Sequence, residues 1–349
     1  MALRVSVPVA EHTEEPFAWT GTETSHDRPL LRVRDLVTQF PTRQGWLTAV
    51  NHVSYELRAG RVLGVLGESG SGKSAMLRTI LGLQPTSTRI SGEVILRDRD
   101  LISMSPRERK DIRGEWVSMV FQDPMTALDP VFTVEQQLVE TIRRHRPMSK
   151  AAASERALEL LKTVQISSPE RRLKAYPFEL SGGMRQRVVI AMALVSSPSL
   201  LLADEPTTAL DVTVQARVLD LFRELKDGLG MAIIFVTHDL AVAAEISDDI
   251  AVMYAGRIVE SGRLEDIVRS PQHPYTRGLL EANIRPGQTE RPEAIPGAPP
   301  NLANLPPGCS FAPRCHAARG ECWEALPHLT VVSPTQQVRC VLAAPEGAR

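Results

Sequence analysis

The sequence predicts an α/β fold in which helices cover both faces of a mainly parallel β-sheet. From Leu30 onward, short apolar runs alternate with segments of helical periodicity, and this alternation is typical of parallel sheets. Between about residues 106 and 179 we predict no strand, and apolar positions from Ala157 to Val164 recur at i, i+3, i+4 and i+7, which indicates an inserted helical subdomain. From Arg285 onward, Pro, Gly and Cys become frequent, which indicates a small Cys-rich C-terminal extension.

The individual elements follow from the length and spacing of the apolar runs. Runs of about four to eight residues rich in Val, Ile and Leu predict strands, and longer runs with periodic apolar positions predict helices. In chain order we expect strands at 31–36, 50–57 and 62–66, a helix from the following glycine-rich loop to Leu83, a helix at 187–195, a strand at 199–203, a helix at 212–228, a strand at 232–237 and a helix at 239–246. A Pro- and Gly-rich extension cannot build a core unaided, so we expect its cysteines to staple it.

Composition and charge exclude some classes of partner. The 40 Lys and Arg residues balance 41 Asp and Glu residues, so the net charge of −1 gives no overall attraction for nucleic acid, and we expect no nucleic-acid partner. The predicted helical subdomain is locally basic, and a solvated surface is favoured over a docking patch. The longest strongly apolar run, 188–195, is far shorter than the ~20 residues that span a bilayer, so a role at a membrane requires partner subunits. Residues 1–29 lack the pattern of a secretory signal and are interpreted as a flexible tail.

A glycine-rich loop follows the predicted strand at 62–66 and matches the pattern G-x-x-x-x-G-K-S/T. In such a loop the glycines allow a tight turn, so that backbone N–H groups and the helix N-terminus bind phosphate oxygens. Lys73 is expected to bridge the β- and γ-phosphates, and the Ser74 hydroxyl to bind Mg²⁺. A glycine-rich turn without a ligand is the alternative, and the strand and helix on either side argue against it. The pattern indicates a P-loop NTPase (RecA-like) core, and the expected nucleotide-binding residues of the loop are Gly67, Ser69, Gly70, Ser71, Gly72, Lys73, Ser74 and Ala75.

Two adjacent carboxylates follow the predicted strand at 199–203. Neighbouring strand residues point to opposite sides, so we assign Asp204 to the Mg²⁺ site and Glu205 to polarising the attacking water. An acidic pair at a strand end can be a simple turn, but together with the phosphate loop it indicates a Walker B segment. His238 follows the predicted strand at 232–237, at the sheet edge where ligands bind, and is expected to contact the γ-phosphate and the attacking water.

A second predicted anion site lies far from the first along the chain. Ser181, Gly182 and Gly183 precede a predicted helix, and exposed N–H groups at a helix N-terminus bind anions. Two phosphate-binding devices in one chain are difficult to explain with a single nucleotide per monomer. They suit a dimer that encloses two ATP molecules, in which each chain contributes one device to each site.

Taken together, these motifs resemble the ABC ATPase family from Leu30 to about Gly262, in the family's order and spacing. The resemblance implies a nucleotide-binding domain at 30–262, with a helical subdomain at about 106–186, that uses ATP and Mg²⁺. In the family, Gln122 joins the Mg²⁺ site and links it to the transmembrane subunits, and an upstream aromatic residue stacks on adenine. Phe40 is our candidate for that aromatic residue, and Trp46 is the alternative. The resemblance further implies nucleotide contacts from the signature segment and from Asp211 in the D-loop, with catalytic roles for Glu205, His238, Gln122 and Lys73.

Longer segments resemble the oligopeptide/dipeptide importers in particular. Residues 121–130 (FQDPMTALDP), 180–187 (LSGGMRQR), 205–215 (EPTTALDVTVQ) and 273–278 (HPYTRG) match that subfamily almost position by position. Met184 stands where the wider family usually has Gln, and the subfamily commonly tolerates Met there. The resemblance implies an ATPase subunit that energises the import of di- or oligopeptides across the cytoplasmic membrane. Nickel chelates, glutathione or another small solute are the alternatives.

The same resemblance implies the partners. They are a second ABC ATPase subunit, either a relative or a copy, two transmembrane permease subunits and an extracytoplasmic solute-binding protein. The chain is then expected on the cytoplasmic face of the cell membrane, held there by the permease. A soluble ABC protein acting on ribosomes or DNA is disfavoured, because such proteins usually carry two cassettes or a long coiled-coil insertion. A P-loop kinase or GTPase is disfavoured more strongly, because those proteins lack the LSGG signature.

All four cysteines lie in the predicted extension at 263–349, with the spacing C-x5-C-x6-C-x17-C. This spacing lacks the close C-x-x-C pair typical of structural zinc ribbons, and four thiolates in a reducing compartment suit an iron–sulfur cluster. The extension also resembles that of the oligopeptide importers, which implies a 4Fe-4S cluster with a structural role. Zinc and the absence of a metal are the alternatives. The expected ligands are Cys309, Cys315, Cys322 and Cys340.

Overall fold

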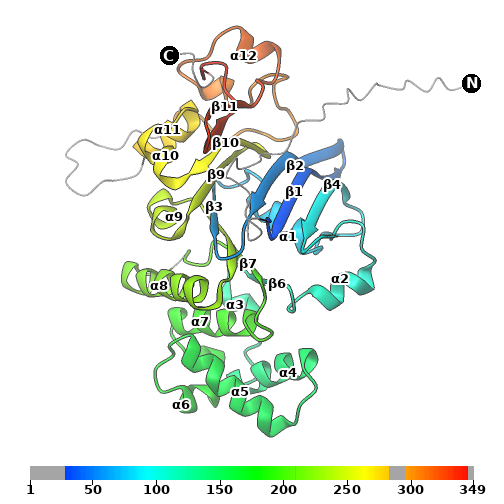
Figure 1. Ribbon diagram of the computed structural model, residues 1–349, viewed down its shortest axis with the longest axis vertical. Helices are drawn as coiled ribbons and strands as arrows, with labels where there is room; N and C mark the ends of the chain where they lie inside the picture. The colour runs from blue at the N-terminus through cyan, green and yellow to red at the C-terminus, as the bar shows by residue number, and fades with distance from the viewer. Residues whose placement is uncertain (1–27, 209, 283–294, 345–349) are drawn as a thin grey trace, which may run out of the picture.

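The computed structural model describes residues 28–208, 210–282 and 295–344. Nearly all of the predicted tail at 1–29, and Ala209 of the D-loop, therefore lie outside the described residues. The molecule is elongated, with two β-sheets in its central part (Figure 1). The helices α4 (Val134–His145), α5 (Lys150–Thr163) and α6 (Pro169–Leu173) form one end, and the opposite end contains α12 (Glu321–Glu324).

The larger sheet has eight strands in the order β11-β12-β10-β9-β3-β8-β7-β6. From β9 to β6 all neighbouring strands are parallel, so β3, β7 and β8 end at the same edge. This arrangement confirms the predicted fold class of a mainly parallel α/β core. The strands are β3 (Val62–Leu66), β6 (Val117–Val120), β7 (Leu200–Asp204), β8 (Ala232–Thr237), β9 (Asp249–Tyr254), β10 (Arg257–Arg263), β11 (Thr330–Ser333) and β12 (Gln336–Val338).

Both faces of the parallel strands are buried, which explains their continuous apolar sequences. In β8, Ile234 packs in the core cluster that contains α1 (Lys73–Ile80), and Phe235 packs in the opposite cluster with α8 (Val212–Leu229). Phe235 meets the ring of Phe222 edge to face, at a centroid distance of 5.5 Å. The helix α9 (Leu240–Ile246) contributes to the same cluster as α8.

The smaller sheet is antiparallel, with strands in the order β2-β1-β4-β5, and packs on the α1 side of the parallel sheet. The hairpin of the first two strands extends to the pair Thr42 and Gly45, beyond the apolar runs that predicted them. The backbone pairing therefore continues where the side chains are exposed. The strands are β1 (Leu31–Thr42), β2 (Gly45–Leu57), β4 (Arg89–Leu96) and β5 (Arg99–Asp100).

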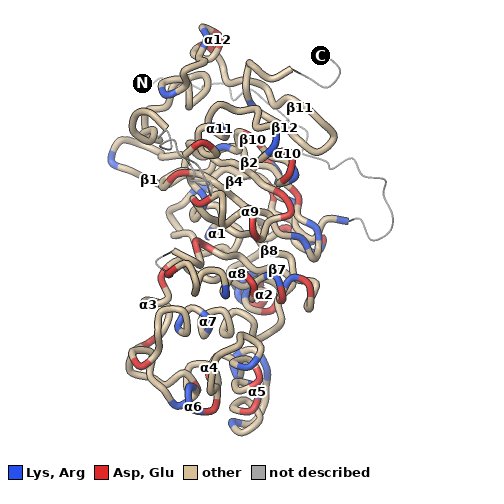
Figure 2. Tube along the Cα trace, turned by 90° about the vertical axis from the view of Figure 1, so that its left-hand side faces the viewer, with Lys and Arg blue, Asp and Glu red and all other residues tan. Residues whose placement is uncertain are grey.

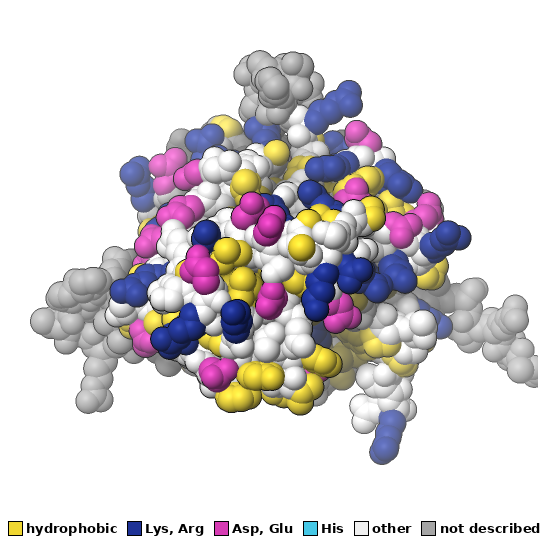
Figure 3. Space-filling view, turned by 90° about the horizontal axis from the view of Figure 1, so that it is seen from below, with side chains coloured by type: hydrophobic (Ala, Val, Ile, Leu, Met, Phe, Trp, Pro, Cys, Tyr) yellow, Lys and Arg dark blue, Asp and Glu magenta, His cyan; other side chains and the backbone are white. Residues whose placement is uncertain are grey.

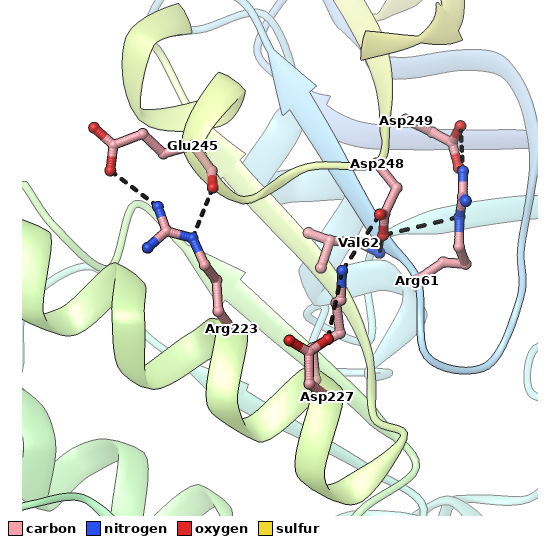
Figure 4. Close-up of polar contacts among 8 residues, drawn as sticks. Arg61, Val62, Arg223, Asp227, Glu245, Asp248 and Asp249 are labelled. Atoms are coloured by element: carbon pink, nitrogen blue, oxygen red, sulfur yellow. Dashed lines mark hydrogen bonds and ion pairs between the residues drawn. The ribbon is translucent and has the colours of Figure 1, made fainter. Parts of the chain in front are cut away.

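Ion pairs fix the beginning of β3 against its neighbours (Figure 4). Arg61 donates to both carboxylate oxygens of Asp249, at 3.0 and 2.9 Å. Asp248 accepts a hydrogen bond from the backbone N–H of Val62 at 2.7 Å and pairs with Lys226 of α8 at 3.3 Å. These contacts fix the start of β3 against the start of β9 and, through Asp248, against α8. The loop after β3 therefore has a defined position.

The helical subdomain follows the antiparallel sheet along the chain. It contains α3 (Pro124–Ala127), α4, α5, α6, the 3-10 helix η1 (Pro177–Glu179) and α7 (Gly182–Ala193), and α2 (Pro106–Ile112) precedes it. The predicted face of α5 is confirmed, because Ala157, Leu160 and Leu161 are buried. Two expectations are wrong: β6 lies within the range predicted to lack strands, and α7 begins at the signature glycines instead of Arg187.

The C-terminal part of the chain is attached to the core by more than its cysteines. The strand β12 pairs with β10, for example through Val338 and Glu260, and so continues the main sheet. Phe311 is buried and contacts the rings of Tyr254 and Tyr275 at centroid distances of 5.2 and 5.3 Å. Strand pairing and aromatic packing therefore hold this region to the core, in addition to any contribution of its cysteines. Its remaining elements are α10 (Leu264–Arg269), α11 (Pro274–Glu281) and the 3-10 helix η2 (Ala312–Arg314).

The surface carries both signs of charge. Figure 2 shows Lys, Arg, Asp and Glu distributed along the helices of the subdomain end. Seen from that end in Figure 3, basic and acidic side chains are interspersed with apolar ones, without a large patch of one sign. Within the described ranges, none of the helices combines the length and the apolar character that a membrane span requires.

Candidate nucleotide site

A cavity of about 830 Å³ opens at the edge where β3, β7 and β8 end. Its polar side comes from the phosphate loop and from residues that follow the other strands. Its apolar side includes three residues from the C-terminal part of the chain. The lining residues are Ala49, Glu68, Ser69, Gly70, Ser71, Gly72, Lys73, Ser74, Ala75, Gln122, Glu205, Thr208, His238, Leu279, Pro299 and Leu302.

The phosphate loop connects β3 to α1 and requires glycine at two tight positions. Gly67 has φ 155° and Gly72 has φ 104°. A Cβ atom at Gly67 would lie 2.2 Å from the carbonyl oxygen of Met253, and one at Gly72 would lie 2.2 Å from that of Ala49. The sequence therefore places glycines where the backbone itself is packed, and the N-terminus of α1 faces the cavity.

Lys73 is buried at the base of this loop. Its Nζ donates to the carbonyl oxygen of Gly67 at 2.6 Å and to that of Glu68 at 3.0 Å. Burial lowers the pKa of Lys73, and the nearby carboxylates of Glu205 and Asp204 oppose that shift. The ammonium group is thus held at the loop, beside the cavity in which a phosphate is expected.

Asp204 and Ser74, the two residues predicted to bind Mg²⁺, lie in direct contact. The Ser74 hydroxyl donates to Oδ1 of Asp204 at 2.8 Å, although the two residues are 130 positions apart. Burial raises the pKa of Asp204, and the hydrogen bond from Ser74 opposes the shift. A buried carboxylate beside a hydroxyl is an oxygen-rich environment that suits Mg²⁺ and its bound waters.

Glu205 is the centre of the polar cluster. Its Oε2 lies 3.3 Å from Nε2 of Gln122, 3.0 Å from the hydroxyl of Thr208 and 3.2 Å from Nδ1 of His238. Its backbone has φ 47°, a left-handed conformation that costs free energy for a residue with a side chain. The residues predicted to be catalytic, Lys73, Gln122, Glu205 and His238, therefore line one cavity.

Several predicted nucleotide contacts lie outside this cavity. Ser181 caps α7, with its hydroxyl accepting from the N–H of Met184 at 3.3 Å, and Gly182 and Gly183 begin that helix. Asp211 caps α8 by accepting from the N–H of Val214 at 2.9 Å. In this single chain, neither segment lines the cavity around the phosphate loop.

The aromatic candidates for adenine stacking also lie elsewhere. Phe40 pairs with Leu47 in the β1–β2 hairpin and does not line the cavity. The Trp46 ring stacks instead with the guanidinium of Arg89, whose carbon lies 3.8 Å from the ring centroid. Adenine stacking by Phe40 therefore stays a prediction.

Sequence reasoning missed the contribution of the C-terminal part of the chain. Leu279, Pro299 and Leu302 line the cavity, and Tyr275 and Arg314 bind Glu68 of the phosphate loop. In the sequence these residues are about 200 or more positions away from the loop. The signals in the sequence were the HPYTRG segment, which contains Tyr275, and the resemblance of the extension to that of the oligopeptide importers, and neither indicated a contact with the loop.

The four cysteines lie around a second, enclosed cavity. Cys309, Cys315, Cys322 and Cys340 all line it, together with His273. Burial raises the pKa of Cys309 to about 11, and it also raises the pKa values of Cys315 and Cys340. Among the described residues, no three potential ligands converge closely enough to hold one metal ion.

The phosphate loop, the Asp204–Ser74 pair and the Glu205 cluster define a P-loop ATPase with the motif order of ABC transporters. Comparison with known proteins agrees. Residues 50–208 match the family described as "ABC transporter", and residues 259–322 match "Oligopeptide/dipeptide transporter, C-terminal region".

Individual relatives support the same family. The chain is 48% identical over 315 residues to "Probable peptide ABC transporter ATP-binding protein y4tR" of Sinorhizobium fredii. This match covers 89% of the present chain and 94% of that protein. It is 49% identical over 299 residues to "Oligopeptide transport ATP-binding protein OppD" of Escherichia coli, and the match covers 85% of this chain and 89% of that protein. A solved post-hydrolysis dimer of the ATP-binding cassette MJ0796, bound to ADP and Pi, matches with TM-score 0.61 at 30% identity, covering 67% of this chain and 98% of that one. The chain belongs to the ATP-binding proteins of oligopeptide/dipeptide ABC transporters.

Proposed function

We propose that this chain hydrolyses ATP to drive the import of di- or oligopeptides through a membrane permease. The observation that carries the proposal is the combination, in one chain, of the Glu205-centred site with the C-terminal region of oligopeptide/dipeptide transporters. The relatives named above are described as peptide or oligopeptide transport proteins, which supports peptides as the solute.

The site residues suggest a division of labour during hydrolysis. Lys73 and the N–H groups of the loop bind the phosphates, and Glu205 accepts the proton of the attacking water. The water oxygen bonds to the γ-phosphorus as the bond to the ADP oxygen breaks, releasing ADP and phosphate. His238 and Gln122, both within 3.3 Å of Glu205, orient the carboxylate and the water. Ser74, Asp204 and Gln122 would hold Mg²⁺, which would supply positive charge to neutralise the phosphates.

Two such chains, or this chain and a related ATPase, would enclose two ATP molecules. The signature segment Ser181–Gly183 and Asp211 lie away from the cavity of their own chain, which supports their use by the nucleotide of a partner. Chemical cross-linking of a cysteine introduced at Ser181 with one introduced at Ser69 tests this arrangement. ATP should promote the link between chains, and a link formed only within one chain would refute it.

The permease should contact the subdomain near Gln122. Four large apolar side chains are exposed there, with exposed fractions from 37% to 69%: Phe121, Met125, Val131 and Phe132. Exposed apolar groups of this size are typical of protein contacts. We therefore place the chain on the cytoplasmic face of the cell membrane, with two permease subunits and an extracytoplasmic solute-binding protein as further partners.

The transported solute is tested by uptake. Cells that carry the wild-type chain should accumulate labelled di- and oligopeptides, and cells that carry Glu205→Gln should not. Glu170→Gln, which changes an exposed glutamate of α6, is the matched control. Undisturbed peptide uptake in the Glu205 variant would redirect the function to nickel chelates, glutathione or another solute.

For the cysteines we propose a 4Fe-4S cluster, with zinc as the alternative. The donor set fits, because four thiols line one cavity and a 4Fe-4S cluster is held by four cysteine thiolates. His273 supports the proposal: its Nδ1 accepts from the N–H of Tyr275 at 3.0 Å, so Nε2 carries the proton and is buried without an acceptor. A sulfide or thiolate would supply that acceptor. The cavity is small, about 10 Å³, so the thiolates must move outward to admit the cluster.

Anaerobic purification tests the cluster directly. The protein should show broad visible absorption and about four irons and four sulfides per chain, and the Cys322→Ser variant should lose most of both. About one zinc per chain without iron would contradict the cluster and support the alternative of a zinc site.

A further inference from the structure

The second residue of the phosphate loop is bound by the C-terminal extension. Arg314 Nη1 lies 2.7 Å from Oε2 of Glu68, and Nη2 lies 3.0 Å from Oε1, although the residues are 246 positions apart. The Arg314 side chain is only 6% exposed. Such a two-pronged, nearly buried contact is the strongest form of Arg–carboxylate pair.

The backbone of Glu68 is bound by the same part of the chain. Its N–H donates to the hydroxyl of Tyr275 at 2.9 Å, and Tyr275 is fully buried. Arg314 is itself anchored, because its Nε donates to the carbonyl oxygen of Pro296 at 2.7 Å. The phosphate loop is therefore held by groups on two separate segments, α11 and η2, that follow β10 along the chain.

The pair with Arg314 matters for charge as well as position. Glu68 lines the cavity in which the phosphates are expected, and its carboxylate would repel them. Arg314 binds both of its oxygens, so the negative charge is neutralised at the wall of the site. On the other side of the residue, the carbonyl oxygen of Glu68 accepts from Lys73.

We propose that Arg314 is a positioning residue of the nucleotide site, and that ATP affinity depends on the extension being attached to the phosphate loop through Glu68. The proposal rests on the ATPase activity of the family but on neither the peptide solute nor the metal. Since Arg314 directly precedes Cys315, any change that displaces the cysteine-rich segment also removes the counter-charge of Glu68.

Equilibrium binding of Mg·ATP and steady-state phosphate release test the proposal together. Arg314→Met should weaken ATP binding on the order of tenfold, because it leaves an unpaired carboxylate beside the phosphates. The kcat should stay near the wild-type value, because Arg314 does not contact the Glu205 cluster. Arg314→Lys should recover part of the affinity, and Arg319→Met, at an exposed arginine of the same extension, is the matched control.

The double variant Arg314→Met, Glu68→Gln separates the charge effect from a general loss of structure. It should bind ATP more tightly than Arg314→Met alone, since the unpaired charge is removed. Wild-type affinity in Arg314→Met, or a double variant as weak as the single one, would overturn the proposal. A wild-type chain that binds no ATP would instead overturn the ATPase function itself.

The coupling must also act in the opposite direction. In the wild type, ATP should slow amide hydrogen exchange in residues 309–322 by tightening the contact between loop and extension. In Arg314→Met at saturating ATP this protection should be lost. Equal protection in both proteins would contradict the proposal even if the variant unfolds more easily.

Discussion

Replacing Glu205 by Gln should separate ATP binding from ATP hydrolysis. The substitution keeps the size of the side chain and removes its charge and its capacity to accept a proton. The amide oxygen can still accept from Thr208, 3.0 Å from Oε2 in the wild type, so the local geometry should be retained. Lys73 should still bind phosphate, because its hydrogen bonds go to carbonyl oxygens of the loop and not to Glu205.

The expected magnitude follows from the role of a general base. Losing such a base typically lowers the rate about 10²- to 10⁴-fold, which corresponds to about 3–5 kcal/mol of transition-state stabilisation. The carboxylate is the shared partner of Gln122, Thr208 and His238, so no other acid among the residues that line the cavity occupies an equivalent position.

Phosphate release at saturating Mg·ATP measures the rate, and equilibrium ATP binding measures the affinity. We expect the variant to bind ATP with an affinity within about threefold of the wild type and to form a more stable dimer with ATP. Its turnover should fall to about 1% of the wild-type rate or less, because loss of a general base lowers the rate at least about 10²-fold. Turnover above roughly one third of the wild-type rate would exclude Glu205 as the base.

Three further variants test other parts of the structure. Phe222→Ala should lower the free energy of unfolding in urea by about 3–5 kcal/mol, whereas Val212→Ala, 82% exposed on the same helix, should change it by less than ~0.5 kcal/mol; similar losses would contradict the assigned core. Asp204→Asn should make the nucleotide-free protein more stable at pH 7, because burial raises the pKa of Asp204 and penalises its ionised form in the folded state. In the wild type this penalty on the folded state develops as the pH rises from the ordinary pKa of Asp through the raised pKa. The difference in stability between variant and wild type should therefore vanish below the ordinary pKa, and a difference that does not depend on pH would contradict the prediction. Ser74→Ala should raise the Mg²⁺ concentration for half-maximal phosphate release about tenfold, and an unchanged titration would remove Ser74 from the site.

Much of the core was predictable because its signals are local. The strand at 232–237 was placed to the residue, since a parallel strand buried on both faces reads as one continuous apolar run. The strand β6 was missed, because four residues in a mostly helical region carry no periodicity, and only pairing with β7 makes them a strand. The start of α7 was also misplaced, because its glycines are poor helix formers and the cap from Ser181 decides the boundary.

The sequence by itself determined the chemistry of the nucleotide site: the glycines, Lys73 and the paired acids lie at fixed spacings, because each must occupy one point of a strand–loop–helix unit. The convergence of Gln122, Thr208 and His238 on Glu205 followed once the strands were ordered in parallel, since their carboxyl ends share one edge. Only the tertiary structure brought Arg314 to Glu68, because a contact between residues 246 positions apart depends on how the extension folds back over the sheet. No local pattern encodes that return, which is stabilised by the packing of Phe311 against Tyr254 and Tyr275 and by the pairing of β12 with β10.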